Sequence, residues 1–204
     1  MKNYLNNIGV NVVQSELKYD CCEYDLKKII SQTNYLCCDG IIASGGGKVL
    51  DAGKLIAHLL SINCITIPFS ASTCAGWTAL SNIYSPEGRF IKDITLKKCP
   101  NLLIFDHSIV RAAPPRTLAS GIADAVAKWY ESSLTSNSSQ DGFVQQAVQM
   151  ARLLRDQLFL NSYNAFLDPL SNSWEIVAEG CALTAGIIGG LGGARCRTAV
   201  AHPI

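Results

Sequence analysis

The chain has 204 residues, 49% of them apolar, and a formal net charge of +1. This length allows one large domain or two small ones with a sizeable core. The small net charge and the lack of a basic stripe argue against a nucleic-acid or polyanion surface. No uninterrupted apolar run is long enough to span a bilayer, and residues 1–11 are too polar for a signal peptide, so we expect a cytoplasmic protein with no membrane partner.

Nine cysteines are present, a high number for this length. The adjacent pairs Cys21-Cys22 and Cys37-Cys38 lack the C-x-x-C spacing of zinc sites and redox motifs. Most of the cysteines stand beside apolar neighbours, as Cys64 does. We therefore expect reduced, mostly buried thiols and no disulfide framework.

Strand and helix patterns alternate in the first half of the chain. Residues 8–13 are apolar and β-branched, which predicts a strand, and residues 23–30 have helical spacing. Residues 41–44 and 64–68 predict two more strands, with a helix at 48–60 between them. This helix is expected to turn a set of apolar side chains inward: Leu50, Leu55, Ile56, Leu59 and Leu60. The alternation predicts a parallel sheet covered by helices.

Three glycines and a lysine, Gly45 to Lys48, join the strand at 41–44 to the helix that follows it. Glycines allow the backbone to approach a ligand closely, and the free N–H groups and dipole of a helix start favour an anion. Lys48 would add a positive charge. The stretch therefore suggests a phosphate site, but many strand-to-helix turns are glycine-rich, and neither G-x-x-x-x-G-K-[ST] nor G-x-G-x-x-G spacing is present. From these residues alone, both interpretations stay open.

The pattern changes after residue 68. Residues 69–80 are mostly small or hydroxylated, which suits either a loop whose backbone lies against a ligand or an ordinary polar connection. Residues 82–91 predict a β-hairpin, and residues 102–105 predict the last strand of the sheet. Asp106 is expected to cap a short helical turn that ends at Val110.

Pro114-Pro115 is the best candidate for a domain boundary, because proline restricts the residue before it. After it, helical spacing recurs in three segments and no strand is predicted: residues 117–134, 142–160 and 174–188. The predicted organisation is an α/β domain at 1–114, with a Rossmann-like parallel sheet, followed by an all-α domain at 115–204.

Two residues of the second half could bind a metal. Asp124 lies among apolar residues one turn into a helix, where it could stabilise the helix dipole or serve as a metal ligand. His202 follows small residues and could reach a bound ion, although a lone histidine is more often structural. Residues 195–201 have the pattern of a new helix, so we expect that the chain is truncated where that helix begins.

Four stretches occur together, in order, in this chain. They are residues 45–54 (GGGKVLDAGK), 70–88 (SASTCAGWTALSNIYSPEG), 120–131 (SGIADAVAKWYE) and 192–202 (GGARCRTAVAH). Together they resemble the glycerol dehydrogenase branch of the iron-containing alcohol dehydrogenase family. The resemblance implies a dehydroquinate synthase-like fold, with an α/β nucleotide-binding domain and an incomplete all-α domain. It also implies a cleft that holds NAD and one divalent metal, zinc in preference to iron.

The resemblance also assigns site residues. Those around the cofactor are Gly46, Gly47 and Lys48 at the pyrophosphate, with Ser72, Thr78, Leu80 and Tyr84. Asp124 and His202 would be two of three protein ligands of the metal. Cys74 occupies the position of a substrate-binding aspartate in glycerol dehydrogenases, and Phe69 that of a cofactor-contacting threonine. The ribose-reading residue would precede Met1 and the third ligand would follow Ile204, so we expect an internal fragment.

The favoured hypothesis is a metal-dependent alcohol or polyol dehydrogenase that uses NAD, with the metal polarising the substrate hydroxyl. Its partner would be a small alcohol or polyol, and the full-length protein would form homo-oligomers. One alternative is a non-catalytic, truncated remnant. Another is a phosphorylated-polyol dehydrogenase or a dehydroquinate synthase relative, which a basic residue within 70–84 would favour, and that stretch contains none.

Overall fold

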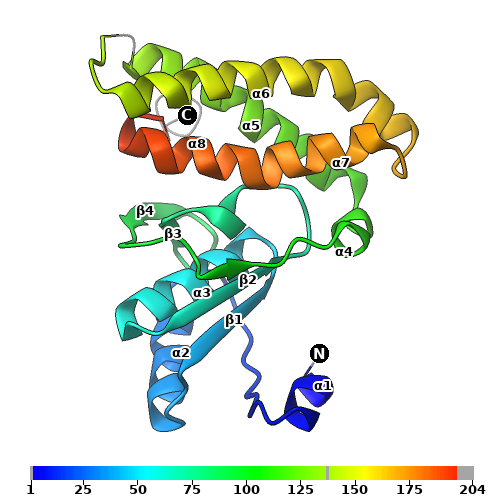
Figure 1. Cartoon of the computed structure of the whole chain (residues 1–204). Coiled ribbons are helices and arrows are strands. Elements are labelled where there is room, and N and C mark those ends of the chain that lie inside the picture. Colours follow the sequence, from blue (N-terminus) through cyan, green and yellow to red (C-terminus); the bar gives the residue numbers. More distant parts are fainter. Residues whose placement is uncertain (1, 137, 197–204) are drawn as a thin grey trace.

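A three-stranded parallel sheet lies at the base of the molecule, below a layer of helices (Figure 1). The computed structural model describes residues 2–136 and 138–196. Strand β1 (Gly40–Gly45) pairs with β2 (Asn63–Pro68) along its whole length, and β2 pairs with the short β5 (Leu102–Leu103). The carboxyl ends of these strands point toward the helical layer.

Helix α3 (Gly47–Leu60) packs against β1 and β2, and α2 (Glu23–Tyr35) packs against α3. Leu50, Leu55 and Ile56 are buried, as the spacing predicts. The inward orientation predicted for Leu59 is wrong, because its side chain is 57% exposed. It lies in the last turn of α3.

The strand predicted at residues 8–13 is absent, and this prediction is wrong. A short helix, α1 (Lys2–Asn7), is followed by irregular backbone up to α2. Ile8, Val10 and Val13 are all exposed. The β-branched composition favours a strand where a neighbouring strand completes the ladder, and no described strand pairs with this segment.

The predicted β-hairpin is confirmed. Strands β3 (Leu80–Tyr84) and β4 (Phe90–Thr95) form an antiparallel pair beside the main sheet. Gly88 takes φ +83° in the turn, a conformation that favours glycine. The predicted cap of helix α4 (His107–Arg111) is also confirmed, because the Asp106 carboxylate accepts hydrogen bonds from the N–H groups of Ser108 and Ile109.

Helices dominate the remainder of the described chain, which contains no strand after residue 115. Helix α6 (Gly142–Leu167) packs against α5 (Pro115–Ser136), α7 (Asn172–Glu179) and α8 (Ala185–Gly192). A π-helical turn, η2 (Gly180–Thr184), joins α7 to α8, and a 3₁₀ turn, η3 (Gly193–Cys196), follows α8. The predicted stripe of α6 is confirmed: Val144, Ala151, Leu154 and Leu158 are buried and Val148 is partly buried. The fold is thus α/β followed by all-α, as expected.

The continuous helical segment Asn172–Gly192 is long and apolar enough to cross a membrane, with a mean hydropathy of 1.3. Its most apolar window is 56% buried inside the fold. This degree of burial is typical of a core helix.

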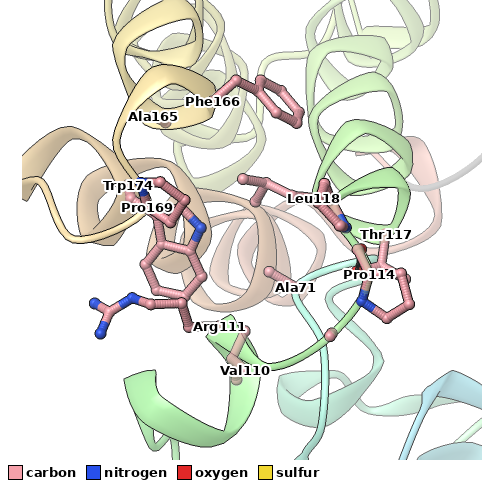
Figure 2. A pocket seen from close by; sticks show the side chains of 12 residues that line it. Ala71, Val110, Arg111, Pro114, Thr117, Leu118, Ala165, Phe166, Pro169 and Trp174 are labelled. Atoms are coloured by element: carbon pink, nitrogen blue, oxygen red, sulfur yellow. Dashed lines mark hydrogen bonds between the residues drawn. The ribbon is translucent and has the colours of Figure 1, made fainter.

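Helices α4 and α7 meet beside a small cavity of about 70 Å³ (Figure 2). The Arg111 guanidinium stacks on the Trp174 ring at 4.6 Å and lies 3.4 Å from Glu175. His107 Nε2 lies 2.9 Å from Glu179 Oε1. These contacts attach the end of the α/β half to the helical half.

None of the nine cysteines is bonded to another. Cys37 is exposed, Cys38 and Cys99 are partly buried, and the others are buried. The expectation of mostly buried thiols is confirmed.

Candidate cofactor and substrate site

The glycine turn lies at the carboxyl end of β1. Gly45 has φ +155°, and Gly46 caps α3 without any side-chain hydrogen bond to the helix. A Cβ at Gly46 would meet no atom within 4 Å. The start of α3 therefore has open space beside it and no side chain of its own to satisfy its first N–H groups, which suits an anionic ligand.

Lys48 forms an ion pair that its place in the sequence does not predict. Its Nζ lies 2.5 Å from Oδ2 of Asp20, whose side chain is 2% exposed, while the Lys48 side chain is 64% exposed. Asp20 belongs to the irregular segment before α2. An anion at the glycine turn would therefore share Lys48 with Asp20.

The segment 69–80, which we call the hydroxyl loop, is enclosed by helices from both halves. On the α3 side, a Cβ at Gly47 would lie 3.0 Å from Cγ2 of Thr73. On the helical side, a Cβ at Gly121 of α5 would overlap the carbonyl oxygen of Ala71, and one at Gly186 of α8 would lie 2.9 Å from the Trp77 oxygen. Glycine is required at Gly121 and Gly186 because backbone meets backbone there, whereas Gly47 faces a side-chain methyl group.

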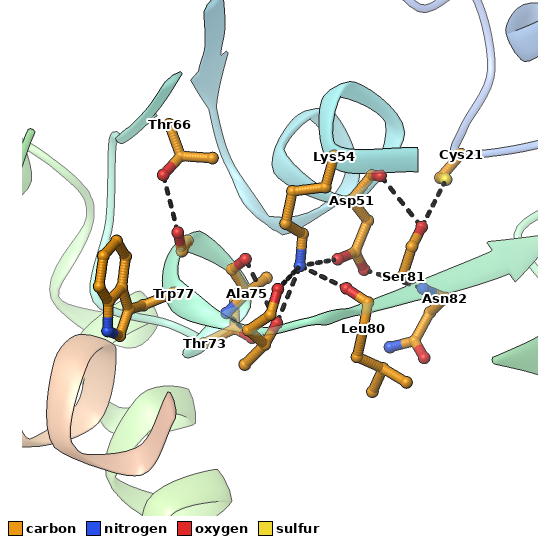
Figure 3. Close-up of polar contacts among 12 residues, drawn as sticks. Cys21, Asp51, Lys54, Thr66, Thr73, Ala75, Trp77, Leu80, Ser81 and Asn82 are labelled. Carbon is orange, nitrogen blue, oxygen red and sulfur yellow. Dashed lines mark hydrogen bonds and ion pairs between the residues drawn. The ribbon is translucent and has the colours of Figure 1, made fainter. Parts of the chain in front are cut away.

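The buried ammonium of Lys54 fixes the end of this loop (Figure 3). It lies 2.9 Å from Asp51 Oδ1 and donates to Thr78 Oγ1 at 2.8 Å. It also donates to the carbonyl oxygens of Thr78 and Leu80. Lys54 thus holds two of the predicted cofactor residues against α3.

Asp51 extends the same network to β3. Its Oδ2 accepts a hydrogen bond from the Asn82 N–H at 3.2 Å, and its carbonyl oxygen accepts one from Ser81 Oγ at 3.0 Å. Burial raises the pKa of Asp51, although the adjacent Lys54 opposes this shift. Burial, with Asp51 and Asp20 nearby, also raises the pKa of Tyr84. The network therefore joins α3, the hydroxyl loop and the hairpin.

The other predicted loop residues have local partners. Ser72 Oγ lies 3.0 Å from Ser70 Oγ. The Tyr84 ring meets the Phe90 ring edge to face, and its N–H donates to the Cys21 carbonyl oxygen. Phe69 is exposed, and its N–H donates to the Gly45 carbonyl oxygen at 2.9 Å, so the exit of β2 lies beside the glycine turn.

Cys74 lies where α5 covers the hydroxyl loop. The residue is 8% exposed, and burial raises the pKa of its thiol. Lys128 of α5 is also buried and interacts with this thiol. Burial lowers the pKa of Lys128, but Cys74, Asp124 and Glu131 outweigh it, so the pKa is raised and the ammonium stays charged. No local sequence pattern identifies this contact, because it joins residues 54 positions apart.

Asp124 shares this region. Its side chain is 25% exposed, and its Oδ2 lies 3.9 Å from Lys128 Nζ. Cys181, on the π-helical turn, is fully buried nearby; burial raises the pKa of its thiol, and Asp124 and Cys74 add to the effect. The Asp124 carboxylate is thus reachable from solvent, while the thiols beside it are neutral.

The predicted metal site is not assembled by the described residues. Within residues 2–136 and 138–196, no three His, Cys, Asp or Glu side chains lie close enough together to hold an ion. His202, the other predicted ligand, lies outside the described residues. The Asp124 carboxylate is partly exposed and suits a divalent cation, but it supplies only one ligand group.

Neither cavity contains a predicted site residue. The small one of Figure 2 is lined mostly by apolar groups, with Arg111 at its edge. A second cavity, of about 270 Å³, lies at the opposite end of β2 from the glycine turn, and Lys54 is one of the residues that line it. Of the hydroxyl loop, Ala71 borders the small cavity, and no residue of the loop borders the second one.

A glycine turn and an uncapped helix start at the carboxyl edge of a parallel sheet are typical of α/β proteins that bind phosphate-containing ligands. The family model of the iron-containing alcohol dehydrogenases matches residues 1–107. The chain belongs to this family.

Three related proteins illustrate the match. An uncharacterised oxidoreductase of Synechocystis is 46% identical over 198 residues, which cover 97% of this chain and 51% of the relative. Hydroxycarboxylate dehydrogenase A of Escherichia coli is 29% identical over 90% of this chain and 52% of its own length. The crystal structure of glycerol dehydrogenase from Schizosaccharomyces pombe matches 98% of this chain and 52% of that chain, with 31% identity and a TM-score of 0.83. The chain spans about half the length of these relatives.

Proposed function

We propose that this chain carries the cofactor and substrate residues of an alcohol dehydrogenase that oxidises a small alcohol or polyol and transfers hydride to NAD. The supporting observation is the hydroxyl loop, which lies between the open start of α3 and helix α5. In this proposal, Gly46, Gly47 and Lys48 receive the pyrophosphate. Ser72, Thr78, Leu80 and Tyr84 surround the rest of the cofactor.

We assign Asp124 and His202 to one divalent metal, with zinc preferred to iron. When bound, such an ion polarises the substrate hydroxyl and favours its deprotonation. In this proposal, the chain presents the partly exposed Asp124 carboxylate to the ion, near the buried Cys74 and Cys181 side chains. We also propose a cytoplasmic homo-oligomer, with small molecules rather than nucleic acid or membrane as partners.

Cofactor binding can be tested without catalysis. Gly46→Val places a side chain in the open space beside α3, and extended backbone at φ −82°, ψ 179° accepts valine. We expect NADH affinity, measured by nucleotide fluorescence, to fall at least about tenfold with the melting temperature unchanged. Gly142→Val, which also enters open space but on α6, is the matched control. Unaltered NADH affinity in Gly46→Val would refute the site.

Activity is tested by NADH formation from glycerol, 1,2-propanediol and simple alcohols, after chelation and then with added zinc or iron. We expect added metal to restore turnover, and Asp124→Asn to abolish this response. Asp93→Asn, which changes an exposed carboxylate on β4, should behave as the unaltered protein does. NADH binding with no turnover of any alcohol would favour the non-catalytic alternative.

A further inference from the structure

The cavity of about 270 Å³ is lined by an excess of basic side chains. It lies between the last turn of α3, the start of β2 and the segment 96–101 that leads into β5. Lys54, His58, Lys97 and Lys98 line it, and among the described residues no Asp or Glu does. The cavity is therefore electropositive, in a chain whose net charge is only +1.

Two of these lysines carry charges that no carboxylate offsets. The Lys54 ammonium is paired with Asp51 at 2.9 Å. Lys97 and Lys98 are exposed, and neither forms an ion pair within residues 2–136 and 138–196. The Lys98 charge also acts on the buried Cys64 thiol in the wall, where it opposes the rise in pKa that burial causes. Two ammonium groups are thus available to an anion.

The neutral polar groups of the wall have donors left over. His58 Nδ1 accepts a hydrogen bond from the Lys97 N–H at 3.4 Å, so the proton of the neutral ring is on Nε2. Asn101 Oδ1 accepts from the Cys64 N–H at 3.0 Å, which leaves the amide NH₂ as a donor. An anion, which accepts hydrogen bonds, fits these groups better than a cation does.

The carboxyl end of α3 also lies at this cavity, and exposed carbonyl oxygens there would repel an anion. Two of them are occupied. The Ser61 N–H donates to the His58 carbonyl oxygen at 3.3 Å, and the Ile62 N–H donates to that of Ala57 at 3.0 Å. Ser61 takes φ +56° to make this closure. The helix end therefore presents fewer free acceptors to the cavity.

We propose that this cavity binds the phosphate monoester of a small metabolite. Its dianionic phosphate matches the two free charges of Lys97 and Lys98. Ile62, Leu96 and Pro100 provide an apolar wall for the carbon part. The volume is below the range of about 300–1,000 Å³ that is typical of sites for drug-sized ligands, so a dinucleotide is too large. This site is separate from the glycine turn and does not depend on the proposed function.

The test is calorimetric titration without NAD, in a phosphate-free buffer of low ionic strength, because salt screens exposed charges. The probes are glycerol 3-phosphate, inorganic phosphate and glycerol. We expect glycerol 3-phosphate to bind at least about threefold more tightly than inorganic phosphate, and glycerol not to bind measurably. In the double variant Lys97→Met/Lys98→Met, the Kd for glycerol 3-phosphate should rise at least about tenfold.

Two controls locate the binding. Lys27→Met/Lys28→Met removes an adjacent pair of exposed lysines from α2, with the same loss of charge, and should leave the Kd unchanged. Gly46→Val blocks the glycine turn, which is the other candidate anion site, and should also leave it unchanged. Lys97 and Lys98 are exposed, so their variants should fold, which circular dichroism checks.

Several results would overturn the proposal. Glycerol 3-phosphate that does not bind, or binds no better than inorganic phosphate, excludes a monoester site. Binding that is lost in Gly46→Val and kept in the Lys97/Lys98 variant assigns the phosphate to the glycine turn. An equal loss in both lysine double variants shows a general charge effect. NADH affinity is measured separately, so the proposed function can fail while this site stands, and the reverse.

Discussion

Lys54 connects the helix that begins at the glycine turn to the loop that faces it. Its ammonium contacts Asp51, Thr78 and Leu80 inside the protein. We predict that Lys54→Met lowers the free energy of unfolding by about 3–5 kcal/mol, because it leaves the buried Asp51 carboxylate without its cation. Urea denaturation measures this change.

The control is Lys27→Met, which removes an exposed i,i+4 pair with Glu23. Its expected cost is below about 0.5 kcal/mol. Equal destabilisation by the two substitutions would show that the Lys54 network has no special role.

Burial also sets the reactivity of the cysteines. It raises the pKa of Cys21 to about 12 and that of Cys64 to about 11, whereas Cys37 is exposed. Alkylation requires the thiolate form, which a raised pKa makes scarce at pH 8. We predict that iodoacetamide labels Cys37 in the native protein and leaves Cys21 and Cys64 unlabelled, as read by peptide mass spectrometry. Rapid labelling of Cys21 would contradict this environment.

Local sequence patterns identified candidate site residues, but they did not identify the distant residues that contact them. The glycines suggested the anion site because backbone freedom is a local property. The Asp20 partner of Lys48 and the Cys74 partner of Lys128 are distant in the chain, and no local pattern identifies them. Lys54 did have a local signal, a lysine three residues after Asp51 on an otherwise buried face.

At the scale of elements, Gly121 determines how closely α5 can lie against the hydroxyl loop. A Cβ there would overlap the carbonyl oxygen of Ala71, and backbone cannot move aside as a flexible side chain can. We predict that Gly121→Ala lowers the melting temperature by at least about 5 °C, since overpacking costs about 1–3 kcal/mol.

Gly142→Ala is the matched control because it also lies in a helix but would meet no atom within 4 Å. Helix propensity favours alanine, so we expect a change of about zero or a small gain in stability. Equal melting temperatures for the two variants would show that α5 does not approach the loop this closely.

Element positions were predicted well where burial follows a period. Helices α3 and α6 have apolar stripes that match their buried faces, and Asp106 supplies a local capping signal. The strand at residues 8–13 failed because strand formation depends on a partner, which composition does not encode. The π-helical turn at Gly180–Thr184 also lacked a signal, since it lies inside the continuous apolar helical segment Asn172–Gly192.

At the scale of the molecule, the two halves share the hydroxyl loop and the contacts between α4 and α7. The boundary at residue 114 stays a prediction. We predict that the sheet and the helical layer unfold in one transition, because the loop packs tightly against α3, α5 and α8. Hydrogen exchange along a urea series should give the same midpoint for amides of β2 and α6. Two separated midpoints would show that the halves are independent.

The enclosure of the hydroxyl loop has a consequence for synthesis on the ribosome. The loop is synthesised once residue 80 is added, but helices α5 and α8, which pack over it, end only at residues 136 and 192. At typical elongation rates of about 5–20 residues per second, the nascent chain carries the loop uncovered for on the order of ten seconds. During that interval Lys54 and Asp51 are its available anchors, so their ion pair can order the loop before the helices that close over it exist.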